Sequence, residues 1–191
     1  MKQKIRGVAI NDADYPVCPK VNGKTQWCPF YRRWKNMIER CYSQTYQETK
    51  PTYEKCYVTK DWLLFSTFKT WMEVQDWSGR ALDKDLLVAG NKEYGPRTCV
   101  FIHNNINTLL TYDKRSSANL MPGVTKLGAK FRATIGTNTK TAHLGVFISE
   151  GTAHRAWRDA KAKIIEAARE LTDDIRVKEA LTKRSWDLLC L

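Results

Sequence analysis

The sequence lacks any long apolar run. No stretch approaches the roughly 18 consecutive apolar residues that a membrane-spanning helix needs. Residues 1–15, MKQKIRGVAINDADY, are basic at the start but lack the apolar segment of a secretory signal peptide. We therefore expect a cytoplasmic protein that has no membrane partner.

Closely spaced cysteine pairs are also missing. The chain has six cysteines but no C-x-x-C pair, and in a reducing cytoplasm they are expected to be thiols or metal ligands rather than disulfides. Four thiolates around one Zn²⁺ make a structural site, so zinc is one hypothesis, and buried free thiols that only pack are the other. The zinc hypothesis uses Cys18, Cys28, Cys41 and Cys56.

Acidic residues are scarce relative to basic ones. The 20 Asp and Glu face 32 Lys and Arg, which gives a formal net charge of +12. Such an excess attracts polyanions, and here it is interleaved with aromatic residues rather than massed in one tail. No catalytic triad, phosphate-binding loop or nucleotide-binding glycine motif stands out. Nucleic acid is therefore the expected partner; the alternatives are a basic soluble protein without such a role, or one that docks on acidic proteins or membranes.

The N-terminal part of the chain is predicted to be helical. A helix is expected over residues 31–42, because its apolar residues recur at the spacing of one helical face. Asp61 is placed to cap the next helix, whose aromatic residues between Trp62 and Met72 would pack on the first. Such stripes are more typical of a core than of a base-stacking surface.

Two further segments have strand patterns. Residues 82–88 and 99–102 are predicted strands, and a helix begins at Asn104. After Met121, three short alternating segments predict a sheet, and Ser149 is placed to cap a long helix. The expected class is α+β.

The C-terminal segment GVTKLGAKFRATIGTNTKTAHLGVFISEGTAHRAWRDAK, residues 123–161, resembles the ethylene-response-factor type of DNA-binding domain, which also occurs in phage and homing-endonuclease proteins. The resemblance implies a three-stranded antiparallel sheet packed on one helix, and double-stranded DNA as partner. The matching positions are Gly123, Val124, Lys130, Phe131, Ala133, Ile135, His143, Leu144, Gly145, Phe147, Ala153, Ala156 and Trp157.

Charge and alternation agree with this resemblance. If Phe131, Ala133 and Ile135 face the helix, the residues between them face away from it. Such a sheet can enter the major groove and present side chains to bases and phosphates; the alternative is a solvated sheet face. The expected DNA contacts are Lys126, Lys130, Arg132, Thr134 and Lys140.

The segment LDKDLLVAGNKEYGPRTCVFIHNNIN, residues 82–107, resembles the ββα-metal core of phage HNH endonucleases. In that family one divalent cation polarises the scissile phosphate while a His activates water. The resemblance implies that Asp83 and Asn107 are metal ligands. Lys84 stands at the position of the general base His, and Thr98 stands at the usual Asn.

Two nearby residues compensate in this hypothesis. Asp85 would share a strand face with Asp83 and complete a carboxylate pair for Mg²⁺ or a similar cation. His103, four residues before Asn107, would act as base or ligand, and Lys84 would be a base only if burial lowered its pKa. The alternatives are an exposed salt-bridge cluster and a surface histidine.

The predicted domains are an HNH-like region with a helical front (1–115), the DNA-binding domain (119–170) and a helical tail (171–191). The leading hypothesis is a phage HNH-like, homing-type endonuclease that hydrolyses DNA in the host cytoplasm. A catalytically inactive DNA-binding regulator is the alternative that Lys84 and Thr98 favour. A third hypothesis is a phage inhibitor of a host protein, bound through aromatic residues near 27–34 or 71–77.

Overall fold

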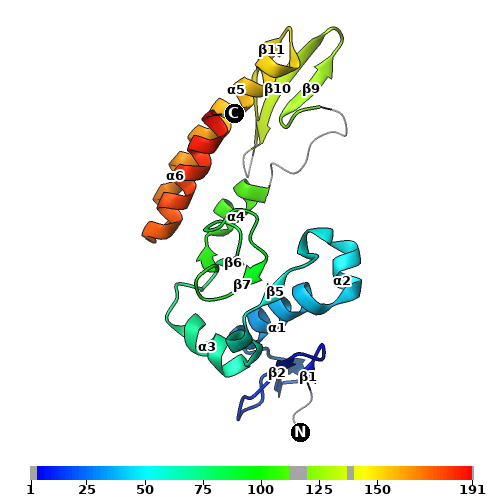
Figure 1. The fold of residues 1–191 in the computed structure, drawn as a ribbon, viewed down its shortest axis with the longest axis vertical. Helices are drawn as coiled ribbons and strands as arrows, with labels where there is room; N and C mark the ends of the chain where they lie inside the picture. The colour runs from blue at the N-terminus through cyan, green and yellow to red at the C-terminus, as the bar shows by residue number, and fades with distance from the viewer. Residues whose placement is uncertain (1–3, 112–119, 137–139, 191) are drawn as a thin grey trace. The chain divides into compact units, whose positions relative to one another are not determined.

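Figure 1 shows the computed structural model of the chain, which describes residues 4–111, 120–136 and 140–190. Its contacts divide the chain into two units, Met1–Phe101 and Ile102–Leu191, which are taken in turn. The predicted domain boundary, at residues 115–119, lies outside the described residues. The α+β class is confirmed.

The first unit is built on helix α1, whose apolar face packs on α3. Trp34 is completely buried between them, and its indole Nε1 donates a hydrogen bond to the Trp62 carbonyl oxygen at 2.7 Å. The predicted helix over residues 31–42 is confirmed. The helices of this unit are α1 (Pro29–Tyr42), α2 (Gln44–Thr49), α3 (Phe65–Glu73), and the 3-10 helices η1 (Pro51–Tyr53) and η2 (Lys60–Leu63).

Short strand pairs surround these helices. Two of the pairs are antiparallel, β1 with β2 and β3 with β4, whereas β5 and β7 are parallel. Their bounds are β1 (Lys4–Ile5), β2 (Ala9–Ile10), β3 (Lys20–Val21), β4 (Lys24–Thr25), β5 (Tyr57–Val58) and β7 (Glu93–Tyr94).

The predicted cap of the second long helix is wrong. Asp61 lies inside η2, and α3 begins only at Phe65 without a capping side chain from its own N-cap residue. Asp12 takes that role: its carboxylate accepts hydrogen bonds from the Ser66 backbone N–H at 2.8 Å and from the Ser66 hydroxyl at 2.5 Å. The cap therefore comes from a residue far away in sequence.

Strand β6 (Ala81–Asp83) pairs with β8 (Val100–Ile102), and α4 (Asn104–Thr111) follows. The prediction that the first strand runs to Val88 is wrong. The Asp83 carboxylate accepts the backbone N–H groups of Asp85 and Leu86, and such an Asx turn bends the chain out of the strand.

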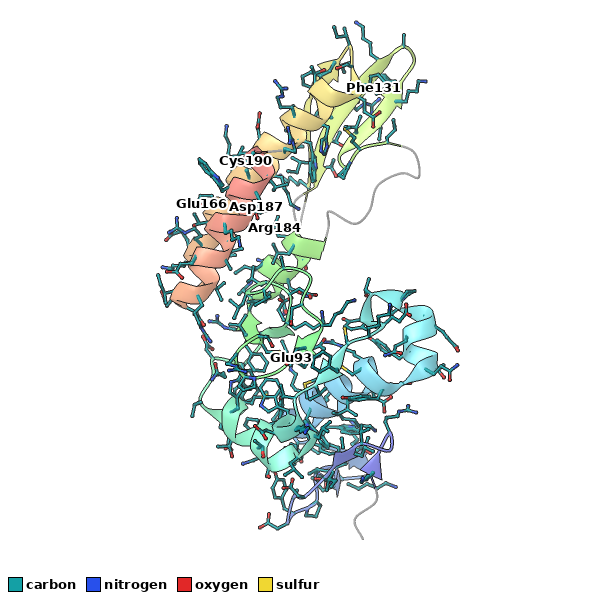
Figure 2. All side chains as sticks on the ribbon, viewed as in Figure 1. Glu93, Phe131, Glu166, Arg184, Asp187 and Cys190 are labelled. Carbon is teal, nitrogen blue, oxygen red and sulfur yellow. The ribbon has the colours of Figure 1, made fainter. Side chains whose placement is uncertain are left out.

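The second unit contains the predicted three-stranded antiparallel sheet, with strand order β11–β10–β9. Helix α5 covers one of its faces, and Val124, Ala133 and Ala153 form the buried contact. Phe131, labelled in Figure 2, adds to that contact from β10. The strands are β9 (Val124–Leu127), β10 (Lys130–Gly136) and β11 (Thr141–Phe147).

Helices α5 and α6 of this unit pack against each other, and α6 buries one face on α5. Ser149 caps α5 as predicted, accepting the Thr152 N–H at 3.2 Å. The Ser185 hydroxyl donates to the Ala162 carbonyl oxygen at 3.1 Å. Among the described residues, no helix combines the length and apolar character that crossing a bilayer requires. The bounds are α5 (Glu150–Ala167), η4 (Ala168–Leu171) and α6 (Ile175–Leu189).

Candidate functional site

The face of the three-stranded sheet turned away from α5, here called the outer face, follows from the strand register. Ala133 pairs with Val124, and both are buried toward α5. Arg132 is the next residue along β10, so its side chain points to the opposite face, where its partners are Thr125 and Val146. Arg132 therefore occupies the central strand of the outer face.

The same register places further polar side chains on this face. Lys130 pairs with Leu127 and is exposed. Thr134 pairs with His143, because the register shifts between Ala133 and Thr134. Sequence reasoning did not include Thr125 or His143 among the contacts, and the shift that turns His143 outward has no sequence signal. The outer face comprises Thr125, Leu127, Lys130, Arg132, Thr134, Thr141, His143 and Val146.

Two of the five predicted DNA contacts do not lie on the outer face. Lys126 pairs with Phe131, which faces α5, so its Cβ starts on the helix side of edge strand β9, although the residue is exposed. Lys140 is exposed directly before β11. Lys130, Arg132 and Thr134 are thus the predicted contacts that share the outer face.

The sheet carries positive charge and no carboxylate. No Asp or Glu occurs in the sequence between Asp113 and Glu150. The Glu150 carboxylate, at the start of α5, accepts a hydrogen bond from the Met121 backbone N–H at 2.5 Å. The outer-face cations therefore have no acidic neighbour within their own sheet, which leaves a surface attractive to a polyanion.

In the predicted catalytic segment, the polar side chains form hydrogen bonds with the segment itself. Lys84 is only 5% exposed, and its Nζ donates to Asp85 Oδ1 at 2.5 Å and to the Asn91 carbonyl oxygen at 2.7 Å. Asp83 Oδ1 accepts the Asp85 and Leu86 N–H groups at 2.9 and 2.7 Å. Burial raises the pKa of the Asp83 carboxyl above its usual value, against the lowering effect of these two bonds.

These contacts change two predictions about the segment. Asp83 and Asp85 do not share a strand face, because β6 ends at Asp83. Lys84 is a buried hydrogen-bond donor rather than an accessible base. Thr98, at the position of the family's Asn, donates from Oγ1 to the Glu93 carbonyl oxygen at 3.0 Å. Each of these side chains fastens the loop between β6 and β8.

His103 and Asn107 lie in the second unit, at the start of α4. His103 Nδ1 accepts the Asn105 N–H at 3.2 Å, and the His103 carbonyl oxygen accepts the Asn107 N–H at 3.1 Å. His103 therefore acts as the cap of this helix. Within the described ranges, no group of three or more His, Cys, Asp or Glu side chains is arranged to hold a metal ion.

The four N-terminal cysteines do not meet at one ion. Cys28 is the N-cap of α1 and Cys41 lies in its last turn, so thirteen residues of helix hold them about 20 Å apart at roughly 1.5 Å per residue. Thiolates that share one Zn²⁺ each lie about 2.3 Å from it, so the four-cysteine site is wrong. Burial raises the pKa of Cys41 to about 12, as expected of a packing thiol.

The aromatic residues proposed as a host-protein surface are mostly in the core. Trp34 is fully buried, and Trp71 contacts the rings of Trp62 and Phe101. Trp27 differs, because 39% of it is exposed. Trp27 is therefore the most exposed of these tryptophans, while Trp71 is half-buried.

Comparison with known proteins returned no match, whether against protein-family models, curated proteins or solved structures.

Proposed function

We propose that the protein binds double-stranded DNA by placing the outer face of its three-stranded sheet in the major groove. The observation that carries this proposal is the position of Arg132: it lies on the central strand, on the uncovered side of a sheet whose segment contains no carboxylate. The opposite side is filled by α5 and provides the rigid support.

The dimensions of the sheet suit the groove. Neighbouring strands lie about 4.8 Å apart, so the outer strands of three are separated by about 10 Å, and the major groove of B-DNA is about 12 Å wide. Arg132, on the middle strand, would reach furthest toward the base edges, where an arginine pairs with guanine through two hydrogen bonds. Lys130, with Lys126 and Lys140 at the margins, would neutralise phosphates.

Thr134 and Val146 extend the same face with smaller side chains. A threonine hydroxyl can donate to or accept from a base edge, and methyl groups contact the thymine methyl. The mixture of one arginine, one lysine, threonines and aliphatic groups therefore supports base contacts in addition to phosphate binding.

Among DNA-binding functions, the contacts of the segment 82–107 favour the inactive regulator over the endonuclease. The succession of β6, β8 and α4 supports descent from an HNH-type ββα core. Its polar side chains, however, are used to fasten the loop: Lys84 is buried and bonded, and Asp83 closes an Asx turn. Metal-dependent cleavage near Asp83, Asp85, His103 and Asn107 stays a prediction.

Fluorescence anisotropy with labelled duplex DNA tests the proposal. Arg132→Gln should weaken binding by about 1–3 kcal/mol if the guanidinium pairs with a base. Lys163→Gln, which removes an exposed charge from α5 in the same unit, is the matched control and should change affinity little. Equal affinities of the Arg132→Gln variant and the unchanged protein would refute DNA recognition by the outer face of the sheet.

A plasmid assay separates the regulator from the endonuclease. The protein is incubated with supercoiled DNA in Mg²⁺ or Mn²⁺, alongside Asp83→Asn and His103→Ala. The regulator binds without nicking in either metal. Nicking that disappears in both variants would instead establish the endonuclease. Recovery of one defined host protein by a chain that binds no DNA would favour the inhibitor hypothesis.

A further inference from the structure

The first unit carries a second basic feature, a β-hairpin that leads into α1. Its ladder extends beyond β3 and β4, since the Gln26 N–H donates to the Pro19 carbonyl oxygen at 2.8 Å and the Cys28 N–H donates to that of Val17 at 2.9 Å. Asn22 and Gly23 form the turn with φ of 51° and 75°, as in the tight turns that suit twisted hairpins. The hairpin is therefore a defined element with a fixed register.

Register and alternation bring a lysine and a tryptophan to one face of this hairpin. Lys20 pairs with Thr25, and Trp27 is two residues beyond Thr25 on the same strand, so all three side chains share a face. Lys20 and Thr25 are exposed, and Trp27 is 39% exposed. An indole that is accessible beside a lysine differs from the buried tryptophans of the core.

Two side chains of helix α1 contact the Trp27 ring. The Tyr31 ring lies nearly parallel to it, with centroids 6.1 Å apart and an angle of 14° between planes. Lys35, one helical turn after Tyr31, places its Nζ 5.0 Å from the centroid of the Trp27 ring. Both supports come from the same helix face, so the ring is held in a fixed orientation while part of it meets solvent.

The sequence segment around Trp27 carries charge of one sign. No Asp or Glu occurs between Asp14 and Glu39 in the sequence. Lys24 pairs with Val21 and is exposed at the tip of the hairpin, and Arg32 is exposed on α1. We call Lys20, Trp27 and Lys35 the stacking patch.

We propose that the stacking patch binds single-stranded nucleic acid, with an unpaired base stacked on Trp27 and the flanking phosphates on the lysines. A fixed, partly exposed aromatic ring among cations is what sequence-tolerant single-strand binding requires, because every base has a flat face and every linkage a charge. Bases inside a duplex are stacked on each other and cannot cover the ring. The site is separate from the outer face of the sheet and does not depend on it.

Fluorescence anisotropy of the full chain with labelled oligothymidylate and oligouridylate, at low salt, tests this proposal. Trp27→Leu keeps an apolar side chain but removes the ring, and should raise the Kd about tenfold, equivalent to about 1.4 kcal/mol. Trp27→Phe keeps an aromatic ring and should retain most of the affinity. The two oligonucleotides distinguish DNA from RNA as the natural source, and loss of affinity in either arm supports the site.

The lysines are tested with matched double variants. Lys20→Gln with Lys35→Gln should reduce the slope of log K against log salt by about 1.4, since single strands contribute about 0.7 for each phosphate contact. Lys50→Gln with Lys60→Gln removes two exposed charges elsewhere in the same unit and should leave the slope nearly unchanged. Equal slopes for the two doubles would overturn the proposal.

Two other results would also overturn it. One is an unchanged Kd for Trp27→Leu on both oligonucleotides; the other is an equal loss in Trp27→Leu and Trp27→Phe, since stacking predicts that phenylalanine rescues binding. Arg132→Gln distinguishes the stacking patch from the outer face of the sheet, because it should weaken duplex binding and leave single-strand binding intact. Each of the two proposed binding sites can therefore be refuted independently of the other.

Discussion

Replacing Gly123 with alanine should destabilise the sheet of the second unit by about 2–5 kcal/mol, through backbone strain and a steric clash. Gly123 has a φ of +76°, where an L side chain is strained by about 1–2 kcal/mol. A Cβ built there would lie 1.9 Å from Cδ1 of Trp157. Trp157 is 3% exposed, so its ring has no open space to move into.

Gly128 supplies the control for this substitution. Its φ of +60° is similarly left-handed, but a Cβ there meets nothing within 4 Å. Gly128→Ala should therefore cost only the strain, and the excess in Gly123→Ala, about 1–3 kcal/mol, measures the clash, which is a form of overpacking. The gain from a less flexible unfolded chain is common to both variants and cancels in the difference.

Hydrogen exchange measured by mass spectrometry isolates this unit from the first. Peptides that cover β10 and α5 should lose protection much more in Gly123→Ala than in Gly128→Ala, whereas peptides from α1 and α3 should be unaffected. If the two alanine variants lost equal protection, the close packing of the Gly123 backbone on Trp157 would be refuted.

Three other substitutions test the first unit. Asp12→Ala should cost about 1–2 kcal/mol in urea unfolding, because it removes the cap that Ser66 uses, while Asp12→Asn retains an acceptor and should cost less; equal losses would contradict the cap. Trp34→Phe leaves the buried Trp62 carbonyl unpaired and should cost about 2–4 kcal/mol, against less than about 0.5 kcal/mol for the exposed Trp27→Phe. The raised pKa of Asp83 favours the folded state at low pH and loses that contribution as pH rises through the folded value. Asp83→Asn, which keeps an acceptor oxygen, should therefore gain stability relative to the unchanged protein from acidic to neutral pH. If the difference in free energy of unfolding between the two proteins did not depend on pH, burial of the Asp83 carboxyl would be contradicted.

The elements of the second unit were predictable because local patterns decide them. Alternation in 130–135 and the capping residue Ser149 are sufficient to predict β10 and the start of α5. The orientation of His143 was not predictable, because it depends on a register shift between two strands. Similarly, the cap from Asp12 to α3 is a tertiary contact that no local pattern contains.

The candidate catalytic segment shows the same limit. Asp83 and Asp85 have the spacing of one strand face, but the Asp83 side chain bonds the chain that follows it and ends the strand. Lys84 then becomes buried and pairs with Asp85. The spacing of these residues matches that of a metal site, but local hydrogen bonds that compete with the strand determine where their side chains lie.

The salt dependence of duplex binding tests the central proposal most directly. If Lys126, Lys130 and Lys140 each neutralise one phosphate while Arg132 pairs with a base, log K should fall against log salt with a slope of about −2.7, or about 40-fold in affinity between 50 and 200 mM. Lys130→Gln with Arg132→Gln should reduce the slope to about −1.8. Lys163→Gln with Lys183→Gln, two exposed charges of α5 and α6, should leave it unchanged, and identical slopes for the two doubles would contradict DNA binding by the outer face.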